Sequence, residues 1–341
     1  MRRSIIAACG ACLFAASAFA LAACTPSSAT TSEQWRAIDV VSAPVDIGAE
    51  TVGRLRFRGG VALSSESRLF GGLSGLEVLE DGRFLAISDN GIWFDARLEL
   101  DASGALVGVT GFRLAMLRDE QGVEFPSKAT GDSEGLAQLP DGRFAVSFEQ
   151  THLIRIYDLN RDGPFGAAEM GPSLEGVARL PRNVGLEALA AMADGALLVG
   201  AEGGGEATTP LWVAPLDGAA PAPVRIRYPL RTGFSLTALD RLPDGGFVAV
   251  ERFYAPVIGP RARITRFPEA SLNARGEALP ELEELALLTP PLALDNFEAV
   301  SAVRMPDGAT RIYILSDDNF SRRQRTLLYA FDVIEEAAAA D

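Results

Sequence analysis

Length, composition and charge set the first limits on this chain. It has 341 residues, of which 48% are hydrophobic, and a formal net charge of −14 at pH 7. This negative balance excludes nucleic acid as a partner, because binding to phosphates needs a basic surface. The three cysteines all lie before residue 25, and the chain has a single histidine, His152. Together these facts exclude a zinc or copper site of the usual kind in the rest of the chain.

The first 24 residues have the pattern of an export signal. Arg2 and Arg3 precede an apolar stretch, which ends in Leu21-Ala-Ala-Cys24. This ending resembles the lipobox of bacterial lipoproteins and predicts cleavage before Cys24, followed by lipid attachment to it. The alternative is an ordinary cleaved signal in which Cys24 has no role. We therefore expect the chain in the cell envelope, facing the periplasm at the outer membrane, with the lipid anchor as its only membrane contact.

The boundaries between segments follow from composition. The stretch from Thr25 to about Gln34 is rich in serine and threonine, as in a polar tether. The predicted organisation is a signal peptide at 1–23, the lipidated cysteine and tether at 24–45, a folded domain at 46–335 and a tail at 336–341.

A short phrase recurs five times along the folded domain. Each copy has an apolar strand, an Asp-Gly or Pro-Asp-Gly turn, a second apolar strand and a terminal carboxylate, typical of β-hairpins. The copies occupy residues 72–89, 133–149, 186–202, 236–251 and 297–317. Repeats of this length predict an all-β fold of the β-propeller type, in which small four-stranded sheets, the blades, surround an axis.

Third and fourth strands complete most of these units. A third strand follows each phrase, and a fourth is expected at, for example, Val107–Leu117 and Leu174–Leu180. The fifth unit ends after its third strand, and Arg54–Leu63 resembles a fourth strand. We predict five blades, with the N-terminal strand closing the ring and removing exposed sheet edges. The alternative is a sixth blade within the long stretch 255–296.

Acidic side chains recur at matching places in the units. The start of one hairpin strand and the end of the next lie at the same edge of a sheet, so these carboxylates should gather at one mouth of the ring. Starts of first strands carry Glu134, Glu187 and Glu298, and ends of second strands carry Asp89, Glu149, Glu202, Glu251, Asp317 and Asp318. Crowded carboxylates favour a hard cation with oxygen ligands, and calcium is the predicted ion. The alternative is that they cap hairpin ends and face solvent.

Basic residues lie near the same mouth. Lys128 precedes the second phrase, Arg252 follows Glu251, and Arg322 follows Asp318 by four residues. These side chains are candidates for binding the negative charge of an ester substrate. The alternative for each is an ion pair with the neighbouring acids.

Several motifs resemble one bacterial family. They read Asp132-Ser-Glu-Gly-Leu-Ala, Leu186-Glu-Ala-Leu, Val250-Glu-Arg-Phe-Tyr and Ser316-Asp-Asp-Asn-Phe. Together they resemble the phytase-like family known by the description “esterase-like activity of phytase”. The resemblance implies a secreted propeller with a calcium-loaded acidic mouth that hydrolyses esters or phosphoesters. The related calcium-dependent phytases have six blades and several lysines on the substrate face, whereas Lys128 is the only lysine here.

Three functions are compatible with these features. In the first, a monomeric metal-dependent hydrolase acts on a small ester or phosphoester, with Glu149 or Glu187 as general base and Arg252 and Arg322 binding substrate charge. The second is a non-catalytic ligand-binding or scaffold protein of the envelope. The third is a lactonase-like hydrolase of neutral cyclic esters. The fold alone does not choose among them.

Overall fold

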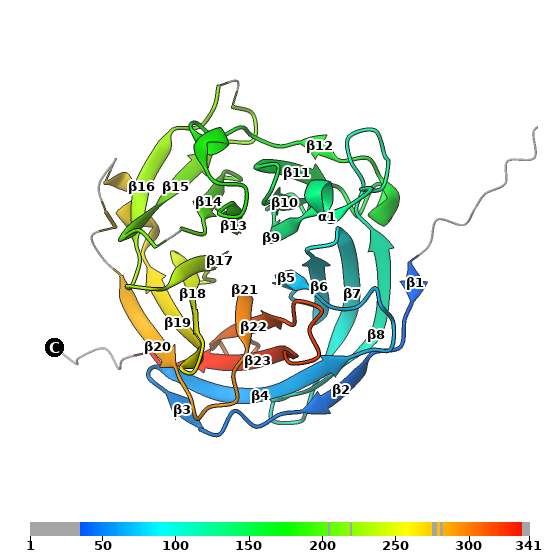
Figure 1. Ribbon diagram of the computed structural model, residues 1–341. Helices are drawn as coiled ribbons and strands as arrows, with labels where there is room; N and C mark the ends of the chain where they lie inside the picture. Colours follow the sequence, from blue (N-terminus) through cyan, green and yellow to red (C-terminus); the bar gives the residue numbers. More distant parts are fainter. Residues whose placement is uncertain (1–34, 204, 219, 275–277, 280–281, 336–341) are drawn as a thin grey trace, which may run out of the picture. The chain divides into compact units, whose positions relative to one another are not determined.

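The computed structural model describes residues 35–203, 205–218, 220–274, 278–279 and 282–335. Its strands form five antiparallel sheets arranged as the blades of a ring (Figure 1). The predicted signal peptide and Cys24 lie outside the described residues, as does the predicted tail. Within the described residues, no helix is both long and apolar enough to span a membrane.

The first two blades follow the chain in order from the axis outward. The first contains β5 (Leu73–Val78), β6 (Arg83–Ser88), β7 (Ile92–Leu100) and β8 (Leu106–Met116), with β1 (Arg36–Ala37) at its outer edge. The second contains β9 (Ser133–Gln138), β10 (Phe144–Phe148), β11 (Leu153–Tyr157) and β12 (Glu169–Met170). The short helix α1 (Lys128–Gly131) directly precedes the second blade.

The next two blades repeat the same order. The third contains β13 (Leu186–Ala191), β14 (Leu197–Ala201), β15 (Thr208–Ala214) and β16 (Val224–Pro229). The fourth contains β17 (Ser235–Arg241), β18 (Phe247–Ala255), β19 (Gly259–Phe267) and β20 (Glu283–Leu288). Three single-turn helices lie in connections, at Gly163–Phe165, Val177–Arg179 and Glu269–Asn273.

The fifth blade joins the two ends of the folded chain. It contains β21 (Asn296–Arg304), β22 (Thr310–Asp317), β23 (Thr326–Val333) and the N-terminal strand β4 (Leu55–Ser64), with β2 (Val41–Pro44) and β3 (Thr51–Val52) paired to β4. The strand β4 therefore closes the ring by pairing with β23, as predicted, and Figure 1 shows its blue ribbon beside the red one. The stretch 255–296 forms strands of the fourth blade, and there is no sixth blade among the described residues.

Two short strands form in the segment predicted as a tether, and one expected strand position was wrong. The strands β1 and β2 lie within the predicted tether, because their backbone groups pair with the otherwise free edges of β8 and β4. The fourth strand of the second blade is β12, not Leu174–Leu180. That segment contains a single-turn helix and Gly176, whose φ of 78° interrupts an extended chain.

The Asp-Gly phrases form the tight turns between the first two strands of each blade. In the first blade Leu79 N–H donates to Arg83 O at 2.8 Å, and Gly82 N–H donates to Leu79 O at 2.9 Å. The same pair of bonds recurs at the corresponding positions of the other four blades. Gly82 has a φ of 77°, which explains the glycine at this place. All five turns lie at the edge opposite the acidic mouth.

A ring of apolar side chains fills the centre of the channel. Each innermost strand contributes one buried apolar residue to this ring, and the five residues are Leu76, Leu136, Leu189, Leu239 and Val300. The cavity around them has a volume of only about 10 Å³, about enough for one water molecule. These residues therefore form the floor of the mouth, and larger apolar clusters between the blades form the rest of the core.

Candidate functional site

A β-bulge at the same place in every blade directs one side chain into the mouth. In the first blade Leu73 pairs with Ser88 and Gly75 with Ile87, so Ser74 is an extra residue on its strand. The corresponding irregularity occurs in the other four blades. Bulges change the direction of a side chain relative to a regular strand. The five residues placed in this way are Ser74, Glu134, Glu187, Thr237 and Glu298.

A second set of five residues stands at the ends of the second strands. Glu149 N–H donates to Asp132 O at 2.9 Å, and Asp89 and Glu202 bond in the same way to Gly72 and Gly185. In the fifth blade the corresponding residue is Asp317, which pairs with Asn296. In the fourth blade Ser235 pairs with Arg252, so the fourth blade presents an arginine here.

The structure corrects the role predicted for Glu251. This residue lies one position before Arg252, and a shift of one residue places a side chain on the opposite face of a sheet. Glu251 is fully buried, and its carboxylate accepts hydrogen bonds from Tyr228 Oη at 2.8 Å and Arg263 Nη1 at 2.7 Å. It joins the third and fourth blades and does not belong to the mouth.

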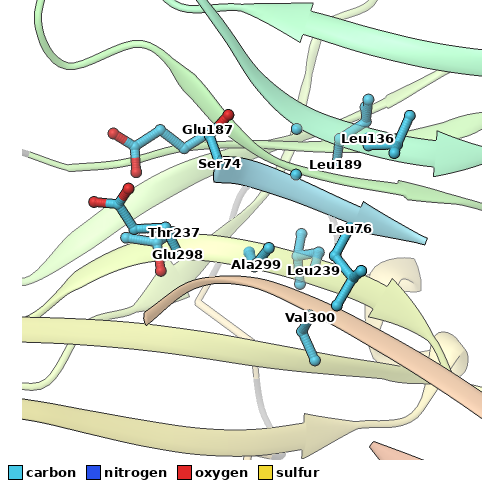
Figure 2. A pocket seen from close by; sticks show the side chains of 13 residues that line it. Ser74, Leu76, Leu136, Glu187, Leu189, Thr237, Leu239, Glu298, Ala299 and Val300 are labelled. Atoms are coloured by element: carbon cyan, nitrogen blue, oxygen red, sulfur yellow. The ribbon is translucent and has the colours of Figure 1, made fainter. Parts of the chain in front are cut away.

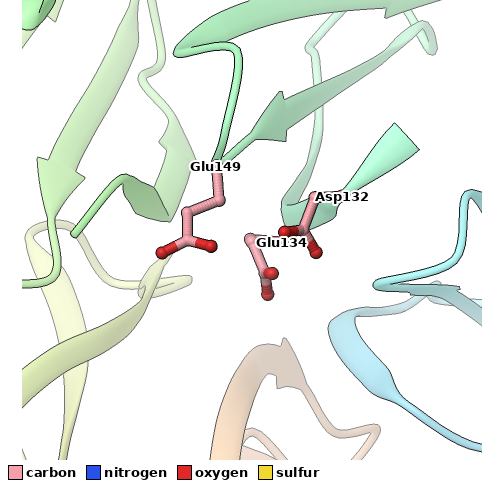
Figure 3. Close-up of side chains that lie close together, drawn as sticks. All are labelled: Asp132, Glu134 and Glu149. Atoms are coloured by element: carbon pink, nitrogen blue, oxygen red, sulfur yellow. The ribbon is translucent and has the colours of Figure 1, made fainter. Parts of the chain in front are cut away.

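Glu149 is the centre of the acidic cluster. One carboxylate oxygen from each of Asp132, Glu134 and Glu149 lies within 4.8 Å of the others (Figure 3), and the same holds for Glu149, Glu187 and Glu202. Figure 2 shows the carboxylates of Glu187 and Glu298 close together, with the apolar floor beyond them. Asp132 was not among the predicted site residues, although it lies two residues before Glu134 in one of the family motifs.

Burial and mutual repulsion raise the pKa values of these carboxyl groups. For Glu149 burial is the largest cause, followed by Asp132 and Glu202, and its pKa is raised to about 7. The pKa of Asp317 is raised to about 9 by burial and then by Glu298 and Asp89. The pKa values of Glu134 and Glu187 lie well above the ordinary value for the same two reasons. Without a cation, Asp317 therefore keeps its proton near neutral pH, and Glu149 is partly protonated.

Lys128 and Arg252 are both bound by acids of the cluster. Lys128 donates to Asp89 Oδ2, and its Nζ lies 3.3 Å from Asp132 Oδ1 without hydrogen-bond geometry. Arg252 donates to Glu202 Oε1 at 2.8 Å and lies 3.4 Å from Glu298 Oε1. Burial lowers the pKa of each cation, but the surrounding carboxylates raise it more, so both remain charged. Both residues therefore form the ion pairs that were the alternative to substrate binding.

Arg322 and Asp318 lie in the connection that follows β22. Arg322 is exposed and lines a groove of about 890 Å³ between this connection and residues 62–70. Asp318 Oδ1 accepts the N–H groups of Gly72 at 2.9 Å and Phe320 at 3.0 Å. Asp318 therefore orders two adjoining loops, and neither residue reaches the carboxylates around Glu149 within the contacts described.

The donor set fits a hard divalent cation. Asp89 Oδ1 and Asp132 Oδ1 are buried and accept no hydrogen bond, so each has a free lone pair beside the cluster. The ligands around Glu149 are all carboxylate oxygens, which calcium prefers. His152, the only histidine, is instead within 3.3 Å of Leu180 O. The residues present therefore fit calcium better than zinc.

Comparison with known proteins gives a family and several similar folds. A family model for phytase-like proteins, described as “Esterase-like activity of phytase”, matches residues 68–320. No curated protein matches the chain.

Among solved structures, a putative gluconolactonase is 14% identical over 88% of this chain and 91% of its own, with a TM-score of 0.43. A gluconolactonase from Xanthomonas campestris is 12% identical over 87% and 99%, with a TM-score of 0.43. The PQQ-bound aldose sugar dehydrogenase from Streptomyces coelicolor is 13% identical over 86% and 99%, with a TM-score of 0.41. At these values the likenesses carry no information about the chemistry of the mouth.

Proposed function

The chain belongs to the phytase-like family described as “Esterase-like activity of phytase”, and we propose that it is a metal-dependent hydrolase of ester bonds that acts at the acidic mouth. The observation that carries this proposal is the sharing of Glu149 by two carboxylate triads above a closed apolar floor. Such a set of carboxylates can bind a cation above this floor, at the mouth of the ring.

The triad of Asp132, Glu134 and Glu149 is the better cation site of the two. Asp132 Oδ1 accepts no hydrogen bond and lies 3.3 Å from Lys128 Nζ, whereas Glu202 Oε1 in the other triad accepts a hydrogen bond from Arg252 at 2.8 Å. When bound, calcium supplies a Lewis acid for the ester oxygen and lowers the pKa of adjacent carboxyl groups.

Glu187 is then the residue proposed to take the proton from the attacking water. It lies beside the first triad through its proximity to Glu149. A nearby positive charge would shift it toward the carboxylate form that a general base needs. Arg252 orients Glu202 and Glu298, and Lys128 fixes Asp89, so these cations position carboxylates in this proposal.

The electrostatics of the mouth favour a neutral ester, including a cyclic one, over a phosphoester. Among the described residues of the cluster, both cations are already bound by carboxylates. A phosphate group would add negative charge to a site rich in carboxylates, and the metal ion would have to balance that charge alone because both side-chain cations are already paired. This supports the lactonase-like alternative over phytate hydrolysis.

Hydrolysis of p-nitrophenyl acetate, δ-gluconolactone and p-nitrophenyl phosphate, each with calcium and with EDTA, tests the proposal. We expect calcium-dependent hydrolysis of a neutral ester and at least a hundredfold loss in Glu149→Gln. Asp81→Asn, at the opposite edge of the ring, is the matched control and should retain activity. Failure to bind calcium, together with no hydrolysis of any substrate, would leave the non-catalytic scaffold as the better proposal.

The cellular location is a separate proposal that rests on the sequence around Cys24. We propose a lipid-anchored monomer of the envelope that faces the periplasm at the outer membrane. Cys24→Ser should release the mature chain from the membrane fraction and remove the mass of the lipid. An unchanged mass and unchanged fractionation would contradict it.

A further inference from the structure

The hairpin formed by β18 and β19 projects beyond the mouth of the ring. The second strands of the first three blades end at Ser88, Phe148 and Ala201, but β18 continues past Arg252 to Ala255. Its pairing with β19 continues from Arg252↔Ala262 to Ala255↔Gly259. Three further residues at about 3.3 Å each extend the hairpin by roughly 10 Å on the side of the acidic cluster.

The tip of this hairpin is apolar and exposed. Tyr254 is 67% exposed, Ile258 is 48% exposed and Val257 is fully exposed. Val257 also has a φ of 74°, a conformation that β-branched residues avoid. The backbone is therefore strained at the place where the most exposed aliphatic side chain points into solvent. Exposed apolar side chains on a strained turn are typical of sites that bind a partner.

The base of the hairpin is rigid and basic. The rings of Phe253 and Phe234 lie 5.3 Å apart, and the guanidinium of Arg261 lies 5.8 Å from the centre of the Phe253 ring. The segment 252–263 contains three arginines and no acidic residue, although the chain as a whole is strongly acidic. Arg252 and Arg263 are paired with carboxylates, so Arg261 is the arginine of this segment that no described ion pair holds. An apolar tip above a basic base matches the layers of a phospholipid surface, in which acyl chains lie below phosphates.

A second exposed aromatic residue lies on the same face of the ring. Phe320 is 42% exposed in the connection after β22, next to Arg322 and Arg323. By strand direction, this connection and the hairpin tip emerge from the same edge of the ring as the acidic cluster. Contacts at both points would place the face that carries the mouth toward the same surface.

We propose that the mouth face docks on a phospholipid surface, with Tyr254, Val257 and Ile258 inserted below the headgroups and Arg261 at the level of the phosphates. A lipid surface is preferred to a protein partner because the tip offers only about five residues, whereas stable protein interfaces use about 20–30 on each side. The contact would be additional to the predicted anchor at Cys24, and the mouth would open toward substrates in or near the membrane.

Vesicle binding of the chain from residue 25 tests this docking. That chain retains every described strand and lacks the predicted lipid, so any binding comes from the folded domain. We expect co-sedimentation with phosphatidylcholine vesicles, reduced at least tenfold in Val257→Asp/Ile258→Ser. The matched control is Val107→Asp, because Val107 is 43% exposed in the turn region at the opposite edge. It should bind like the unmodified chain.

A second measurement does not depend on a disruptive change. Tyr254→Trp should show a blue-shifted emission on addition of vesicles, as its ring leaves water. No co-sedimentation of the unmodified chain, or an equal loss in Val107→Asp, would overturn the proposal. So would a concentration-dependent dimer that Val257→Asp abolishes, because the tip would then bind a second copy. None of these measurements involves hydrolysis, so the docking and the proposed activity fail separately.

Discussion

The second and fourth blades present opposite chemistry at the same three positions of the mouth. Where the second blade has Asp132, Glu134 and Glu149, the fourth has Ser235, Thr237 and Arg252. The strands, bulge and turn of the two blades are otherwise alike. One side of the ring therefore collects three carboxylates with only Lys128 beside them, while the other supplies a guanidinium that pairs with the acids beside it. A repeated backbone can in this way build an asymmetric site by side-chain substitution alone.

The largest expected effect comes from removing the cation of the fourth blade. Arg252→Gln leaves the partly buried carboxylates of Glu202 and Glu298 without their guanidinium. Loss of one partner of a buried ion pair costs about 3–5 kcal/mol, so the free energy of unfolding should fall by about 3 kcal/mol in urea titrations. The control is Arg323→Gln, an exposed change expected to stay within about 0.5 kcal/mol. Equal values for both variants would show that Arg252 does not neutralise the cluster.

Removing a carboxylate of the second blade should act on calcium binding. Glu134→Gln is expected to weaken calcium binding at least tenfold, or about 1.4 kcal/mol, in isothermal titration calorimetry. The metal-free variant should be slightly more stable than the unmodified protein, because repulsion with Glu187 and Asp132 is relieved. The reference is Glu251→Gln, which destabilises the fold but should leave the calcium affinity unchanged. Weaker calcium binding in that variant would place Glu251 in the site after all.

The pH dependence of stability should also report on the second blade. The pKa of Glu149 is raised to about 7 in the folded protein, above its ordinary value, so the folded state binds more protons than the unfolded chain between about pH 4.5 and 7. Stability of the metal-free protein should therefore fall as the pH rises through this range.

Differential scanning calorimetry at pH 5 and pH 8 measures that slope. The decrease in melting temperature from pH 5 to pH 8 should be smaller in metal-free Glu149→Gln than in the metal-free unmodified protein. Saturating calcium should also reduce this decrease in the unmodified protein. A melting temperature that rises with pH over this range would contradict the raised pKa.

The smallest effect is expected from the hydroxyl of the fourth blade. Thr237 Oγ1 donates to either Phe297 O or Val250 O, both at 3.3 Å. Thr237→Ala removes one long neutral hydrogen bond and should reduce the free energy of unfolding by about 0.5–1 kcal/mol in urea. Thr237→Ser, which keeps the hydroxyl, is the matched control. If Thr237→Ala weakens calcium binding, the fourth blade contributes more to the ion than its lack of acids indicates.

The sequence predicted the ring better than it predicted the mouth. The five Asp-Gly turns and the resemblance of Arg54–Leu63 to a fourth strand were enough for the blade number and the closure, because both are local patterns. Both Glu251 and Arg252 were predicted at the mouth, because residue order alone does not tell which of two neighbouring side chains faces it; the pairing of the strands places only Arg252 there. The bulges that direct Glu134 and its equivalents inward also leave no pattern in hydrophobicity.

The pairing of the cations depends on contacts between distant parts of the chain. Lys128 and Asp89 belong to different blades, and so do Arg252 and Glu202. From sequence these cations were candidates for binding substrate, and only the three-dimensional arrangement shows that carboxylates already bind them. Asp132 was missed because it lies before the strand that carries Glu134, outside the positions compared between repeats.

The apolar floor closes the central channel, so the mouth is open on one side only. The floor is made by Leu76, Leu136, Leu189, Leu239 and Val300. Any molecule that reaches Glu149 must arrive from the rim and leave by the same opening. The size of that opening then limits exchange, and a bound product excludes the next substrate until it departs. Widening the floor would open a rear exit toward the hollow of about 510 Å³ at the opposite end, which Glu77 and Asp240 line. Molecules could then enter and leave the mouth by either end.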